Sequence, residues 1–135
     1  MFPVSTTQNG QCFAFPDVCK TPAPPGSPIP LPYPNVGMCL QAIKAAKKVK
    51  VCQRQVITKK SEIPRSSGDE PGTLGGVVSN RFMDKVTYRK GSSKVKIEGQ
   101  ECMYLLAPTG HNGKSANMPA GMQIVPSQVK VLVKP

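Results

Sequence analysis

The stretch from Phe15 to Asn35 (FPDVCKTPAPPGSPIPLPYPN) places eight prolines in twenty-one residues. Each proline fixes its own φ and pushes the preceding residue toward extended geometry, so no helix can form here. A flexible linker would be monotonous and polar, whereas this segment carries apolar side chains such as Val18, Ile29 and Leu31. The sequence therefore predicts an ordered, extended, proline-rich strap over residues 1–35 that packs on the rest of the domain.

The remainder of the chain is built from short segments. A length of 135 residues suits one domain, and the 15 prolines and 12 glycines favour short strands joined by turns. With no tryptophan and few aromatic residues, the core should be thin. We expect a single, mainly β domain over residues 1–135, with a β-rich body over 36–135. Only Met38 to Lys47 predicts a short helix or helical turn.

Three segments share one pattern of alternating apolar and basic residues. KVKV at 48–51 is followed 46 residues later by KVKI at 94–97, and Val129-Lys130-Val131 repeats the centre of the pattern. This alternation predicts half-buried strands near 48–57, 94–106 and 128–133. Each copy alone buries little surface, so three copies favour a pseudo-threefold arrangement around an axis.

The chain is strongly basic, with 18 Lys and Arg against 7 Asp and Glu, a net charge of +11. Such an excess indicates an acidic partner surface, an anionic envelope or nucleic acid. The basic residues are scattered, few aromatic residues lie among them, and no nucleic-acid-binding motif is present. We expect a solvated basic face and no specific nucleic-acid partner, with a small basic nucleic-acid-binding module as the alternative.

The start of the chain, MFPVSTTQNG, has neither the basic nor the apolar region of a secretory signal, so we expect no signal peptide. No stretch has the length of a membrane span, and no stable membrane insertion is expected. The five cysteines are odd in number and irregularly spaced. They favour buried thiols or metal ligands over a disulfide framework.

Several short motifs follow one another from about Cys12 to Val133, nearly the whole chain. In this order they resemble the PAAR-like proteins that carry a proline-rich PIPY motif, relatives of the PAAR tip proteins of type VI secretion and related contractile injection systems. The motifs are FPDVCKTP at 15–22, PLPYPN at 30–35, SSGDE at 66–70, GSSKVK at 91–96 and PSQ at 126–128.

The resemblance implies a small cone with a threefold-like base. The base would cap a trimeric valine-glycine repeat spike, one copy per trimer, and the apex would sharpen the spike and carry an effector. The protein would reside in the bacterial cytoplasm before firing and then travel out on the spike tip. The residues we expect to dock on the spike are those of the repeated strands: Val49, Val51, Val95, Ile97, Val129 and Val131.

PAAR tips hold zinc near the apex, mostly through histidines, but this chain has one histidine. One structural zinc would need a Cys₃His set, which is chemically sound for a tetrahedral ion. The competing interpretation is that the cysteines are small buried residues and the histidine a turn residue. The candidate ligands are Cys12, Cys19, Cys39 and His111.

Catalysis is the weaker hypothesis. A Cys-His enzyme would need His111 beside a thiol in an open pocket. The adjacent pair Asp69-Glu70 is interpreted as a solvated loop tip or turn stabiliser, since neighbouring residues rarely point into one site. We therefore expect a non-enzymatic, structural protein.

Overall fold

The computed structural model describes residues 1–135, and the domain is mainly β as predicted. The expected helical segment supplies one short 3₁₀ turn, η1 (Cys39–Gln41). The strands are β1 (Phe2–Pro3), β2 (Gln11–Thr21), β3 (Ile29–Met38), β4 (Lys50–Val51), β5 (Arg54–Gln55), β6 (Glu62–Ile63), β7 (Val86–Tyr88), β8 (Lys96–Ile97), β9 (Gln100–Glu101), β10 (Pro108–His111), β11 (Met118–Val125) and β12 (Leu132–Val133).

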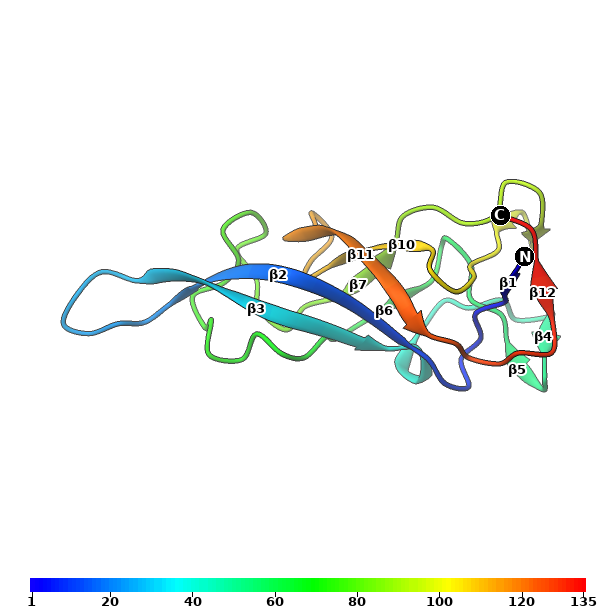
Figure 1. The fold of residues 1–135 in the computed structure, drawn as a ribbon, viewed down its shortest axis with the longest axis horizontal. Coiled ribbons are helices and arrows are strands. Elements are labelled where there is room, and N and C mark those ends of the chain that lie inside the picture. The colour runs from blue at the N-terminus through cyan, green and yellow to red at the C-terminus, as the bar shows by residue number, and fades with distance from the viewer.

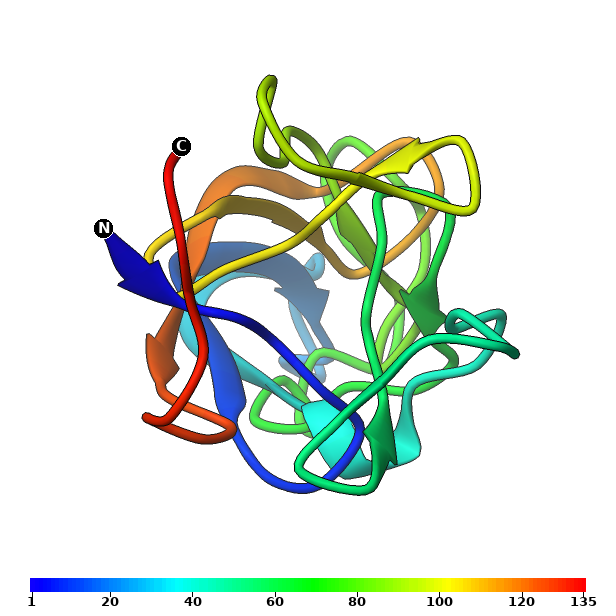
Figure 2. The same ribbon diagram turned by 90° about the vertical axis from the view of Figure 1, so that its right-hand side faces the viewer.

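The main sheet has six antiparallel strands in the order β3-β2-β11-β10-β7-β6. Its two longest strands, β2 and β3, form a hairpin that reaches one end of the elongated molecule (Figure 1). The three two-stranded ribbons, β1-β12, β4-β5 and β8-β9, lie at the opposite end, which we call the base (Figures 1 and 2). The molecule therefore narrows from the base to the β2–β3 hairpin.

The proline-rich segment is extended, as predicted, but it doubles back as a hairpin instead of forming one strap. The chain turns within 22–28, and β3 continues to Met38. Pro30, Pro32 and Pro34 alternate along β3, so all three residues without an N–H face the outer side of this edge strand. Val36, next in the same alternation, points its N–H outward to the carbonyl oxygen of Ser67. The prolines thus break no hydrogen bond between β2 and β3.

The base closes through a cycle of backbone hydrogen bonds between three segments. Ser5 N donates to Met103 O, Met103 N donates to Ile57 O, and Ile57 N donates back to Ser5 O. A second set joins the same three segments in the opposite order, from donors two residues later to acceptors two residues earlier: Thr7 N to Gln55 O, Lys59 N to Glu101 O and Leu105 N to Pro3 O. Three segments that make equivalent bonds in turn define a pseudo-threefold axis through the base.

The repeated strands add a third set of equivalent bonds around this axis. Val56 N donates to Val49 O, Cys102 N to Val95 O, and Val4 N to Val131 O. Val131 is therefore the counterpart of Val49 and Val95. The third copy is KVLV at 130–133, two residues later than the predicted alignment on Val129. The sequence pattern alone cannot set this register, because VKV and KVLV both alternate.

The core lies beneath the base and along the main sheet. It is a thin cluster of 14 buried residues, among them Val4, Val56 and Cys102 at three equivalent positions. Tyr88 and Tyr104 are its largest members, and Phe2 stacks on Tyr104 at the rim. No helix in the structure has the length and apolar character of a membrane-spanning segment.

Candidate functional site

The base presents the predicted docking residues in two environments. Val51, Val95 and Ile97 are partly buried and pack against the core. Val49, Val129 and Val131 are exposed, with Val129 70% accessible. Leu132 is also exposed beside them. Sequence reasoning left it out because the third copy begins two residues later than predicted, which places Leu132 at the position of Lys50 and Lys96. The base thus offers scattered apolar side chains set among lysines.

Each copy begins with a lysine, so Lys48, Lys94 and Lys130 occupy three equivalent positions, and all three are exposed. Lys50 and Lys96 also correspond, while Leu132 takes this position in the third copy. The positive charge predicted for one face is therefore distributed around the pseudo-threefold axis.

A buried polar cluster lies away from the base, where two loops pack on the β2–β3 hairpin. At its centre are Asp17 and Cys19 of β2 and Asp69 of the loop after β6, all fully buried. The metal-ligating atoms of these three residues lie within 4.8 Å of one another, close enough to share one metal ion. Sequence reasoning missed Asp69, which it placed at a solvated loop tip. Only Glu70 of that pair is exposed.

The oxygen atoms of this cluster already accept hydrogen bonds from the chain. Asp17 accepts from the side-chain amides of Asn35, Asn112 and Asn117, and Asp69 accepts from Met83 N at 3.1 Å. No Lys or Arg pairs with either carboxylate, since both ion pairs of the chain use Glu62.

Burial dominates the electrostatics of the cluster. Burial, assisted by hydrogen bonding to Asp17, raises the pKa of Asp69 from 3.8 to about 7. Burial also raises the pKa of the Cys19 thiol to about 12, with further contributions from Asp17 and Asp69. Near neutral pH the Cys19 sulfur therefore stays protonated unless a bound cation stabilises the thiolate.

His111 lies in β10, fully buried, with both ring nitrogens in hydrogen bonds. Nδ1 is 2.7 Å from Asn35 Oδ1, which can only accept, so Nδ1 carries the proton and Nε2 accepts from the Thr109 hydroxyl at 2.9 Å. Burial lowers the pKa of His111 to about 4. The residue is neither a free turn residue nor an open imidazole.

The structure does not bring the four predicted zinc ligands to one point. Cys12 and Cys39 lie in the hydrophobic core, where both thiols contact the Tyr88 hydroxyl at 3.9 and 3.7 Å. Cys19 lies beside Asp69, and His111 is held by Asn35 and Thr109. The group whose spacing suits one ion is Asp17, Cys19 and Asp69, in which two carboxylates replace the expected thiolates and imidazole.

Comparison with known proteins agrees with the resemblance seen in the sequence. Residues 10–119 match the model of the toxin PAAR-like domain. The chain is also 38% identical over 115 residues to the DNase toxin Tse7 of Pseudomonas aeruginosa, a match covering 79% of this chain and 30% of that toxin. The chain thus spans about a third of the length of this curated relative. No solved structure matches it significantly.

The fold and the matched family agree, since a small β protein with a pseudo-threefold base is what the PAAR-like resemblance implies. The chain belongs to the toxin PAAR-like domain family.

Proposed function

We propose that this chain is a tip protein that caps the trimeric valine-glycine repeat spike of a type VI secretion or related contractile injection system. The observation that carries the proposal is the closed cycle of equivalent backbone bonds through Ser5, Ile57 and Met103. A single chain can meet three identical subunits only if it offers three similar faces, and this cycle creates them.

Docking would place the exposed and half-buried apolar residues of the base against the end of the spike, one cap per trimer. The proposed contact residues are Val49, Val51, Val95, Ile97, Val129 and Val131, and we add Leu132 because it is exposed beside them.

The narrow end would then be the leading point. The β2–β3 hairpin is stiffened by the prolines of β3, and the buried polar cluster ties it to the two loops beside it. A rigid point concentrates the force of contraction on a small area of the target envelope. The protein would reach its target by travelling on the spike from the bacterial cytoplasm, together with any effector it carries.

We assign this chain a structural and not a catalytic role. Its only imidazole is buried with both nitrogens engaged, so it cannot accept a proton from a substrate in solvent. Cys52 is the only exposed thiol, and its sulfur contacts the Gln128 amide oxygen.

The DNase toxin to which this chain is similar suggests the second candidate, DNA cleavage or DNA binding by this chain. The observation in its favour is the exposed lysines of the base. Incubation of plasmid DNA with the purified chain and Mg²⁺ tests cleavage, and salt-dependent binding of short duplex DNA tests the nucleic-acid module. We expect neither.

One structural zinc stays part of the proposal, with Asp17, Cys19 and Asp69 as the residues that would hold it. Elemental analysis of the purified chain tests this. We expect any zinc present to be lost in Cys19→Ser and retained in Cys39→Ser, because only Cys19 belongs to the group.

The central test is docking on a purified trimeric valine-glycine repeat spike, measured by light scattering after gel filtration. We expect one cap per three spike chains. Val49→Asp combined with Val131→Asp should abolish the complex, because both residues are exposed on the base.

The matched control is Val77→Asp combined with Val78→Asp, which alters two exposed valines in a loop beside β2, away from the base. This variant should still bind. Absence of a complex with the unmodified chain at micromolar concentration would refute the proposed function.

A further inference from the structure

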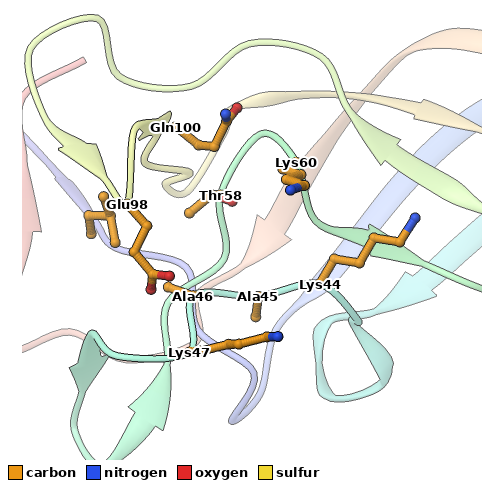
Figure 3. Close-up of a pocket in the computed structure, with 9 residues that line it drawn as sticks. Lys44, Ala45, Ala46, Lys47, Thr58, Lys60, Glu98 and Gln100 are labelled. Carbon is orange, nitrogen blue, oxygen red and sulfur yellow. The ribbon is translucent and has the colours of Figure 1, made fainter.

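A crevice of about 330 Å³ opens on the side of the base between the first two copies (Figure 3). One side is formed by residues 44–47, ahead of β4, and by the loop that follows Ile57. The facing side is formed by Glu98 and Gln100 of the β8–β9 hairpin (Figure 3). Three lysines and one acid line it: Lys44, Lys47, Lys60 and Glu98.

The acidic groups near this crevice are already engaged. Glu98 Oε2 accepts a hydrogen bond from Lys48 N at 3.1 Å, and Lys44 Nζ lies 3.4 Å from Glu62. Both ion pairs of the chain use Glu62, so Lys47 and Lys60 have no acidic partner. Both are exposed. The neutral N–H of Lys48 leaves the charge of Glu98 in place, so three lysines and one acid give the lining a net charge of +2. A concave site of this charge favours a negatively charged ligand.

The pseudo-threefold axis creates two further places equivalent to this crevice. At the second, Gln8, Cys52 and Val129 take the positions of Lys60, Glu98 and Lys47, and the cavity of about 300 Å³ has Lys130 as its only charged lining residue. At the third, the Ser92 hydroxyl donates to Lys134 O, and none of the four cavities of the structure lies there. The first of the three equivalent places is therefore a basic cavity, the second is a weakly basic cavity, and the third has no cavity.

We propose that the crevice lined by Lys47 and Lys60 binds an acidic side chain from one of the three spike chains, and so sets the angle at which the base meets that chain. The inference rests on the proposed function. A trimer presents the same carboxylate three times around its axis. Only one of the three equivalent places carries a cluster of lysines to receive it, so the cap engages the carboxylate of one spike chain and leaves the other two without such a partner. The three orientations related by the threefold axis are equal in energy because the trimer is symmetric.

The first test is cross-linking of the cap–spike complex with a water-soluble carbodiimide. A carboxylate adds to this reagent and becomes an activated ester, an O-acylisourea. A neighbouring lysine amine attacks the acyl carbon to form an amide, and the spent carbodiimide leaves as its urea. We expect mass spectrometry to find Lys47 or Lys60 joined to one acidic position of the spike. Links formed equally through Lys130, or none from Lys47 and Lys60 in an intact complex, would overturn the inference.

The second test is charge reversal. Lys47→Glu with Lys60→Glu should weaken spike binding about tenfold or more, because it places like charges together. Arg81→Glu with Lys114→Glu makes the same change in net charge at two exposed residues away from the base, and should bind as the parent does. Unchanged melting temperatures establish that both variants fold.

The outcomes separate the two proposals. If the unmodified chain forms no complex, the proposed function fails. If it forms one and both double variants bind alike, whether weakened or not, only the crevice inference fails. Protection of Lys47 and Lys60 from acetylation by short duplex DNA, but not by the spike, would assign the crevice to nucleic acid and also overturn the inference.

Discussion

Asp69 and His111 give the folded chain two opposite responses to pH. The folded state holds the Asp69 proton up to about pH 7, whereas an ordinary carboxyl releases it near 3.8, so stability falls as pH rises between these values. The folded state keeps His111 neutral down to about pH 4, whereas an ordinary imidazole gains a proton near 6.5, so stability rises with pH across that range. Between about pH 4 and 6.5 the two effects oppose each other.

Asp69→Asn should leave the pH dependence of stability that is due to His111 without the opposing effect of Asp69. The asparagine oxygen can still accept from Met83 N, but it does not titrate. We expect the free energy of unfolding of the variant, measured in urea from pH 4 to 7, to rise with pH more steeply than that of the parent chain. Parallel curves for the two proteins would show that Asp69 keeps an ordinary pKa.

At the scale of elements, the loop from Ser66 to Met83 is held against the β2–β3 hairpin by close backbone packing. Gly76 forms a β-bridge with Cys19, and a Cβ atom added at Gly76 would lie 2.2 Å from the Asn117 side chain. Asn117 in turn bonds Asp17 and the N–H of Val78. Glycine is therefore required here by space.

Gly76→Ala should destabilise the domain by about 1–3 kcal/mol, because overpacking displaces Asn117 from Asp17. Gly26→Ala is the control. Its added Cβ has its nearest contact at 3.4 Å in the exposed turn between β2 and β3, and it should change stability by at most about 0.5 kcal/mol. Thermal and urea unfolding measure both. Equal effects would mean that Gly76 is not tightly packed.

For the whole molecule, the pseudo-threefold base makes the β12–β1 ribbon equivalent to the β4–β5 and β8–β9 hairpins. Val133 pairs with Phe2 as Val51 pairs with Arg54 and Ile97 with Gln100. Residues 134, 135 and 1 stand where those two hairpins have two-residue turns with positive φ, such as Glu98-Gly99.

A circular permutant tests this equivalence. Replacing residues 134, 135 and 1 by Asn-Gly, which suits such a turn, and opening the chain between Glu98 and Gly99 should give a cooperatively folding protein. We expect a loss of no more than about 2 kcal/mol, because closing one short turn and opening another nearly cancel. Loss of cooperative unfolding would show that the third ribbon is not equivalent.

The sequence pointed to much of this fold through local rules. Pro30, Pro32 and Pro34 dictate extended geometry wherever they lie, and the alternation at 48–51 and 94–97 indicates half-buried strands without reference to neighbours. The motif order was specific enough to indicate the family that the comparisons then showed. By contrast, the hairpin reversal at 22–28 was missed, because the prolines on both sides of the single Pro25-Gly26 pair indicate extended chain whether or not a turn lies between them.

The sequence by itself determined the extended proline segment, the short strands and the family, because these follow from backbone restrictions and patterns within a few residues. Only the tertiary structure decided the register of the third copy, the burial of Asp69 and the separation of Cys12 and Cys39 from Cys19. Each of these depends on which distant segments meet across the base and the hairpin. Such pairing is set by the packing of the whole chain, so it cannot be predicted from the sequence of a few neighbouring residues.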